Sequence, residues 1–181
     1  ALEKGADGLI AVAAGAGGHA GGLSPFALIQ EIRSFFDGPL LLSGAIATGR
    51  AILAAQAMGA DLAYIGSPFI ATAEANADAA YKQMIVDSGA EDIVYSSLFT
   101  GIHGNYLKPS IRAAGMDPDA LGSADASTMD FGKGAAKAKA WSQIWGSGQG
   151  IGAIHEVTPA GALVDRLAAD YAEARQALCA G

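Results

Sequence analysis

The sequence has very little cysteine, little positive charge and no long uninterrupted apolar run. A single cysteine, Cys179, stands among 181 residues, which excludes a disulfide within the chain and a metal site built from cysteines. Lys and Arg number 11 against 18 Asp and Glu, so the clustered cations that bind nucleic acid are missing. Each apolar stretch is interrupted by Gly, Asp or Pro before it reaches the roughly 20 residues that a membrane-spanning helix needs. We therefore expect neither nucleic acid nor membrane as a partner, and the scarce cysteine fits a reducing, cytoplasmic location.

Small and apolar residues are abundant instead. Hydrophobic residues make up 51% of the chain and glycines number 25. This composition supplies a core for about one domain at this length and excludes intrinsic disorder. The glycines do not recur at every third residue as they do in collagen, so they indicate tight turns and closely packed backbone instead.

The first 88 residues alternate three times between a short apolar strand and a helix. We predict strands at 8–12, 40–42 and 62–65. Helices follow at about 24–36, 48–59 and 72–87, and Ser24-Pro25 and Thr48 are typical residues for a helix start. This alternation indicates an α/β fold whose parallel sheet is covered by helices.

The second half of the chain is less regular. We predict a strand at 93–95, irregular structure with short helices over 101–130, a helix at 133–145, a glycine-rich loop at 146–152 and a last amphipathic helix from Thr158-Pro159 to about Leu178. The chain then divides into βα units (1–90), a small inserted domain (91–152) and a C-terminal helix that packs on the first part (153–181).

Glycine-rich loops follow each of the three predicted strands of the first half. The first loop, 15–22, contains His19, and functional groups of parallel α/β folds gather at the carboxyl ends of strands. The other two, 43–49 and 66–69, each join glycine to a helix start, where backbone N–H groups bind phosphate. The alternatives are a solvated histidine and ordinary turn chemistry.

Two further interpretations are weak. The pattern at 15–20 is loosely similar to a dinucleotide-binding fingerprint, but the helix starts too late and no acidic residue ends the next strand. His103 and His155 have no acidic or cysteine neighbours at metal-ligand spacing, so we expect no metal site.

Four segments together resemble the nitronate monooxygenase family, formerly called 2-nitropropane dioxygenases. They are AGGHAG at 16–21, SGAIA at 43–47, GADLAYIGSPF at 59–69 and SGQGIG at 147–152. Their order and spacing follow the family over nearly the whole chain. The resemblance implies an FMN-dependent (β/α)8 barrel with an added small domain, which oxidises alkyl nitronates with O2 to a carbonyl compound and nitrite.

The resemblance also implies roles for individual residues. His19 is similar to the active-site histidine, which can act as a base on a neutral nitroalkane or as a cation that holds the nitronate. Ser147 is expected to orient that imidazole. The residues that the resemblance implies contact FMN are Gly17, Gly18, Ser43, Gly44, Ala45, Gly66, Ser67 and Gln149.

The resemblance leaves part of the barrel unaccounted for. Such barrels have about 250 residues, and their phosphate-binding loops follow strands seven and eight. Segment 8–12 would therefore be strand six. We expect the C-terminal part of a TIM-type (β/α)8 barrel, about strands 6–8, plus a small α-rich domain. The missing strands would belong to further residues of the polypeptide or to another chain, and a homo-oligomer stays open.

Two alternatives to nitronate oxidation also stay open. One is an NAD(P)H-dependent reductase on the same flavin barrel, acting on enoyl-acyl-carrier-protein or quinone. The other is a fragment without catalytic activity. Bound flavin, seen by its visible absorbance, separates the fragment from both enzymes.

Overall fold

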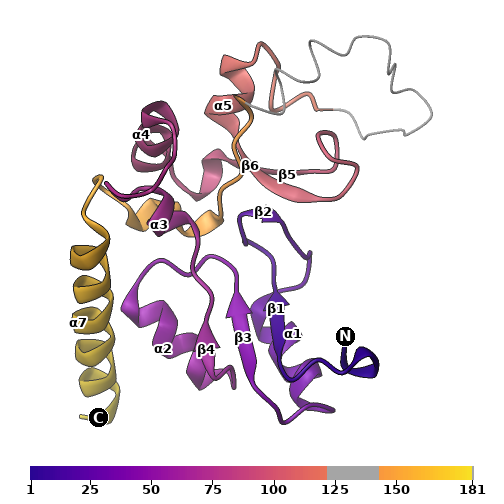
Figure 1. Ribbon diagram of the computed structural model, residues 1–181, viewed down its shortest axis with the longest axis vertical. Coiled ribbons are helices and arrows are strands. Elements are labelled where there is room, and N and C mark those ends of the chain that lie inside the picture. The colour runs from indigo at the N-terminus through magenta and orange to yellow at the C-terminus, as the bar shows by residue number, and fades with distance from the viewer. Residues whose placement is uncertain (122–142, 181) are drawn as a thin grey trace.

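The computed structural model describes residues 1–121 and 143–180 (Figure 1). A parallel sheet with its helices forms the lower part of the molecule in that view, and a second sheet lies above it. None of the described helices is both long and apolar enough to cross a membrane. The predicted helix at 133–145 lies mostly outside the described residues.

The lower sheet confirms the predicted α/β architecture. It consists of β1 (Leu9–Val12), β3 (Leu40–Ser43) and β4 (Leu62–Ala63) in the order β1-β3-β4. Both pairings are parallel, with Ile10 opposite Leu41 and Leu41 opposite Leu62. The strand predicted at 62–65 is shorter than expected. The carboxyl ends of all three strands therefore meet at one edge of the sheet, where the glycine-rich loops begin.

The helices between these strands begin where local sequence predicts. Helix α1 (Pro25–Arg33) starts after Ser24, whose hydroxyl accepts a hydrogen bond from the Phe26 N–H. Helix α2 (Gly49–Ala57) starts after Thr48, whose hydroxyl accepts from the Ala51 N–H. Such caps satisfy amide groups that the first helical turn leaves free. Helix α1 ends a few residues before the expected position.

Only one face of the lower sheet is covered. Ala11, Leu40 and Leu42 are buried with side chains of α1 and α2 in one hydrophobic cluster. On the opposite face, Ile10 and Leu62 remain 51% and 57% exposed. Within the described residues, β1 and β4 are edge strands of the sheet. This side of the fold thus presents apolar side chains and free strand edges.

The upper sheet differs from the sequence-based expectation. Strands β2 (Gly18–His19), β6 (Gly104–Leu107) and β5 (Ile93–Ser96) pair antiparallel in the order β2-β6-β5. Only β5 was predicted. The small unit is therefore not simply α-rich: its sheet packs with α4 (Ala79–Asp87) and α5 (Lys108–Ala113), and η2 (Ala90–Asp92) directly precedes β5. All four residues of β6 are buried, so its sequence lacks the alternation typical of a half-exposed strand.

The single helix predicted at 72–87 is wrong. Helix α3 (Ser67–Ile70) comes first, and α4 starts only after Asp78, whose carboxylate accepts from the Ala80 N–H. Between them Thr72 forms a parallel bridge with Thr158. Local capping and a tertiary contact together outweigh the helical tendency of the intervening alanines.

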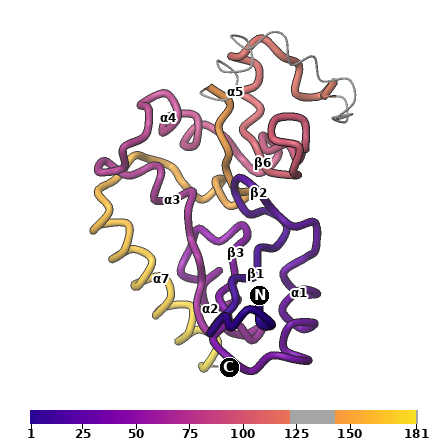
Figure 2. Tube along the Cα trace, turned by 45° about the vertical axis from the view of Figure 1, so that its right-hand side comes forward, coloured from indigo at the N-terminus to yellow at the C-terminus, as the bar shows by residue number. Residues whose placement is uncertain are grey.

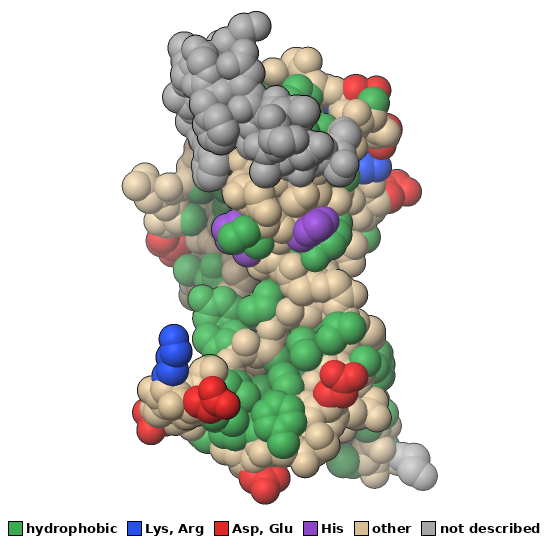
Figure 3. Space-filling model, turned by 90° about the vertical axis from the view of Figure 1, so that its right-hand side faces the viewer, with side chains coloured by type: hydrophobic (Ala, Val, Ile, Leu, Met, Phe, Trp, Pro, Cys, Tyr) green, Lys and Arg blue, Asp and Glu red, His purple; other side chains and the backbone are tan. Residues whose placement is uncertain are grey.

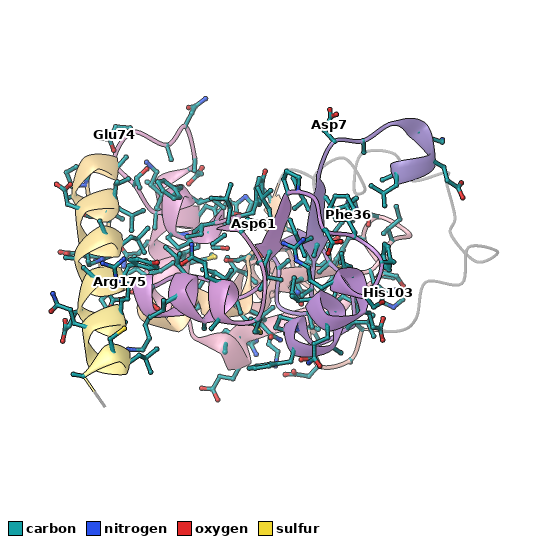
Figure 4. All side chains as sticks on the ribbon, turned by 90° about the horizontal axis from the view of Figure 1, so that it is seen from below. Asp7, Phe36, Asp61, Glu74, His103 and Arg175 are labelled. Carbon is teal, nitrogen blue, oxygen red and sulfur yellow. The ribbon has the colours of Figure 1, made fainter. Side chains whose placement is uncertain are left out.

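The C-terminal helix packs against α2. After the short η3 (Gln149–Ala153), helix α7 (Ala160–Cys179) runs alongside α2 (Figures 1 and 2). Its first amide, that of Ala160, donates to the Glu74 carboxylate at 2.8 Å, and Figure 4 shows Glu74 beside the start of the helix. Leu163 and Leu167 are buried.

Candidate functional site

A cavity of about 300 Å³ lies where the loops after β1, β3 and β4 come together. No charged side chain lines it among the residues that the structure describes. It brings together most of the residues predicted to contact a flavin, but His19, Ser147 and Gln149 do not line it. The predicted residues that line it are Gly17, Gly18, Ser43, Gly44, Ala45, Gly66 and Ser67.

The turn after β3 presents free amide groups to this cavity. Gly44 has φ 150° and Ala45 has φ 54°, a left-handed conformation that costs energy for a residue with a Cβ. Ile46 and Ala47 line the cavity and are 8% and 6% exposed. Their N–H groups have no acceptor among residues 1–121 and 143–180. Because buried amides are nearly always bonded, this turn fits an anionic ligand.

Two amides at the start of α2 are already bonded to protein groups. The Ala51 N–H donates to Thr48, and the Arg50 N–H donates to the Asp170 carboxylate of α7 at 3.0 Å. A carboxylate satisfies the positive end of this helix. Two amides of this first turn are therefore bonded within the protein, whereas those of Ile46 and Ala47 in the preceding turn have no acceptor among the described residues.

Ser67 supplies a hydroxyl to the same cavity from the loop after β4. Its Oγ accepts from the Gly148 N–H at 2.9 Å and from the Ser147 hydroxyl at 3.3 Å. A hydroxyl has two acceptor positions and one hydrogen. Ser67 therefore keeps its own hydrogen for a ligand. Gly66, beside it, has open space where a Cβ would project.

The return loop, residues 146–150, closes one side of the cavity through glycine contacts. A Cβ on Gly148 would lie 2.7 Å from the Gly15 carbonyl oxygen, and one on Gly150 would lie 2.7 Å from that of Ala45. The Gln149 N–H donates to the Gly15 carbonyl at 2.9 Å. Only glycine permits this backbone approach. The Gln149 side chain is exposed.

Asn105 and Tyr81 hold the return loop in place. Asn105 of β6 is buried; its side chain donates from Nδ2 to the Ala16 carbonyl at 2.7 Å, and its backbone carbonyl accepts from the Ser147 N–H at 3.2 Å. The Tyr81 hydroxyl donates to the Gly146 carbonyl. Burial raises the pKa of Tyr81 to about 12, so this donor stays protonated in neutral solution.

Ser147 does not orient His19. Ser147 is fully buried and its hydroxyl donates to Ser67, whereas His19 is exposed and its Nε2 lies 3.0 Å from the Thr100 Oγ1. The predicted pairing is therefore wrong. It fails because β2 places His19 in the upper sheet, while Ser147 is buried in the return loop against Ser67.

Two side chains near the loop that contains His19 were not selected as site residues from the sequence: Tyr95 and His103. The Tyr95 hydroxyl donates to the Ala20 carbonyl at 3.0 Å, and its ring stacks on His103 with centroids 5.0 Å apart. Histidine side chains lie above a gathering of hydrophobic ones on the face shown in Figure 3. Among the described residues, no group of three His, Cys, Asp or Glu is placed to hold a metal ion.

Comparison with known proteins gives these residues a context. The family model described as nitronate monooxygenase matches residues 1–170. The chain belongs to the nitronate monooxygenase family. The identification made from the four sequence segments is thus confirmed.

Individual members and structural neighbours agree with this family. A nitronate monooxygenase of Paraburkholderia phytofirmans is 29% identical over 123 residues, which are 63% of this chain and 34% of the relative. A nitroalkane oxidase structure from Streptomyces ansochromogenes is 33% identical with a TM-score of 0.74, covering 98% of this chain and 55% of that one. The FabK structure from Thermotoga maritima, 24% identical with a TM-score of 0.78, covers 99% and 59% and shares the fold. The chain therefore spans about a third to three fifths of the length of these family relatives and neighbours.

Proposed function

We propose that the intact protein oxidises alkyl nitronates with FMN and O2, giving a carbonyl compound and nitrite. The observation that carries this proposal is the cavity itself: among the described residues no charged side chain lines it, and the Ile46 and Ala47 amides have no acceptor. Membership of the nitronate monooxygenase family supports a flavin as the group that these amides serve.

The residues around the cavity fit the phosphate of FMN. The turn 44–47 and residues 66–67 would hold it through backbone N–H groups and the Ser67 hydroxyl. Such donors bind phosphate without a lysine or arginine. Gly17 and Gly18, which also line the cavity, would lie against the flavin. A bound flavin would supply two-electron oxidation of the substrate and transfer of those electrons to O2.

His19 would act on the substrate from beside this cavity. Its neighbours Gly17 and Gly18 line the cavity, and His19 itself is exposed on β2. As a neutral imidazole it would remove a proton from a nitroalkane, and as a cation it would hold the nitronate. Ser147 would act only indirectly, through its hydrogen bond to Ser67. Gln149 would contribute through the backbone of the return loop.

We further propose that the chain forms about strands 6–8 of a TIM-type (β/α)8 barrel. The uncovered apolar face of the lower sheet and its two free edges support this, because a barrel buries one sheet face inside and leaves no edge. The share of its relatives that the chain spans is consistent with it.

The test is to purify the intact protein and measure its visible spectrum, released cofactor, O2 uptake and nitrite formation with a preformed nitronate. We expect a flavin spectrum, release of FMN, and nitrite that depends on O2. His19→Gln should retain the flavin and lose at least about 100-fold in turnover of a neutral nitroalkane. Flavin reduction by NAD(P)H with no nitronate oxidation would replace this proposal with a reductase, and absence of flavin would refute both.

A further inference from the structure

The partner of His19 is Thr100, which lies between β5 and β6 in the sequence. The His19 Nε2 and the Thr100 Oγ1 are 3.0 Å apart. The threonine is half-buried, and the histidine is exposed. This contact joins the loop after β1 to the upper sheet across a sequence separation of 81 residues.

The surroundings of Thr100 decide which atom carries the hydrogen in that contact. Its hydroxyl donates to the Ile102 carbonyl oxygen at 2.8 Å and accepts from the Ile102 N–H at 3.3 Å. A carbonyl can only accept, and a threonine hydroxyl has a single hydrogen. If that hydrogen pointed to the imidazole instead, the Thr100 hydroxyl oxygen and the Ile102 carbonyl oxygen would lie 2.8 Å apart without a hydrogen between them. The Thr100 oxygen must therefore accept a hydrogen from His19.

We infer that Thr100 is a positioning residue that holds His19 as the tautomer protonated on Nε2, leaving Nδ1 as the basic nitrogen. Its catalytic meaning rests on the proposed function. The Nε2–H donates in both the neutral and the cationic imidazole, so the contact persists when Nδ1 gains a proton. The remaining neighbour, the Tyr106 hydroxyl, lies 3.5 Å from the Thr100 oxygen, at the limit of hydrogen-bond distance. Because Ile102 and His19 fill both acceptor positions of that oxygen, Tyr106 does not change this assignment.

The corresponding proton transfer is balanced. The lone pair of Nδ1 takes the proton from the carbon next to the nitro group of a neutral nitroalkane. The C–H bond breaks, and its electron pair moves toward the nitro oxygens. The products are a nitronate anion and an imidazolium whose Nε2–H still donates to Thr100.

The test is a long-range 1H–15N correlation spectrum of the intact protein labelled with 15N-histidine, recorded at about pH 8, where unperturbed imidazole is neutral. His19→Gln assigns the signals. We expect His19 to be protonated on Nε2 in the wild type, in Thr100→Ser and in Tyr106→Phe. Thr100→Val, which removes only the hydroxyl, should populate both tautomers. The signals of the exposed His155 report whether each variant keeps its fold.

A wild-type spectrum with the proton on Nδ1, or an unchanged tautomer ratio in Thr100→Val, would overturn the inference. Activity gives an independent readout. Thr100→Val should slow turnover of a neutral nitroalkane about tenfold, and Thr100→Ser should restore it. If the wild type oxidises no nitronate, the proposed function fails while the spectra still decide the role of Thr100.

Discussion

Gly148 is the residue on which closure of the cavity most directly depends. A Cβ at this position would lie 2.7 Å from the Gly15 oxygen and 3.1 Å from the Gly17 nitrogen, and neither backbone atom can move without its loop. We predict that Gly148→Ala lowers the free energy of unfolding by about 2 kcal/mol and weakens flavin binding at least about tenfold. Thermal denaturation and a fluorescence titration with FMN measure the two effects.

Gly89→Ala is the matched control for this variant. Gly89 has φ −117°, and a Cβ at this position would have no other atom within 4 Å, so alanine fits there without strain. We expect flavin affinity and melting temperature close to those of the wild type. If Gly148→Ala binds flavin as well as this control does, the close approach of the return loop is not required.

Asp61 gives a pH-dependent contribution to stability. Its carboxylate accepts from the Leu40 N–H at 2.8 Å and from Arg33 at 2.9 Å, and these bonds lower its pKa below the ordinary 3.8. A lowered pKa stabilises the fold above the unfolded-state value and loses that effect as the pH falls through the folded-state value. We therefore predict that wild type exceeds Asp61→Asn in stability at about pH 6 and that the difference shrinks toward about pH 3. Urea denaturation across this range measures it, and a pH-independent difference would contradict it.

The residues of the site differ in how readily sequence predicts them. The glycine and serine positions in the loops after β1, β3 and β4 were found because turn chemistry after a strand is local. The contacts of Thr100, Asn105 and Ser147 were not, since each depends on segments more than 75 residues away meeting in space. Tertiary partners of this kind leave no pattern in a single sequence.

Among the helices, the contact between α2 and α7 depends on one small residue. A Cβ on Gly49 would lie 2.2 Å from both the Leu167 oxygen and the Tyr171 nitrogen, so the two backbones meet directly. We predict that Gly49→Ala separates the helices and lowers the free energy of unfolding by about 3 kcal/mol. Gly161→Ala, in α7 with open space around its Cβ, is the control and should be neutral or slightly stabilising. Chemical denaturation compares the two, and equal stability would refute the contact.

The same contrast between local and distant causes applies to whole elements. Strands β1 and β3 and the starts of α1 and α2 were predicted because apolar runs and capping residues act over a few positions. Strands β2 and β6 were missed. Gly18–His19 becomes a strand only because β6 lies beside it, and its glycine-rich sequence has no strand tendency of its own.

For the molecule as a whole, β2 links the two sheets. It follows β1 of the lower sheet in the sequence, yet it pairs with β6 of the upper one. The cavity therefore has walls from both parts: loops of the lower sheet, and the return loop that comes back from the upper part. A division at residue 90 separates the chain in sequence, but the site requires both parts.

The uncovered face of the lower sheet leads to a prediction for the intact protein. Ile10 is 51% exposed in the middle of β1, beside Leu41 on the same face. If this face lines a barrel interior, a cysteine at position 10 should be inaccessible to thiol reagents. In Ile10→Cys of the intact protein, we expect labelling at position 10 to be at least about 100-fold slower than in the denatured protein. Cys179 is exposed and should react rapidly in the same sample, which makes it the internal control. Equal labelling of both cysteines in the native protein, located by peptide mass spectrometry, would show that the face stays open and that no barrel closes over it.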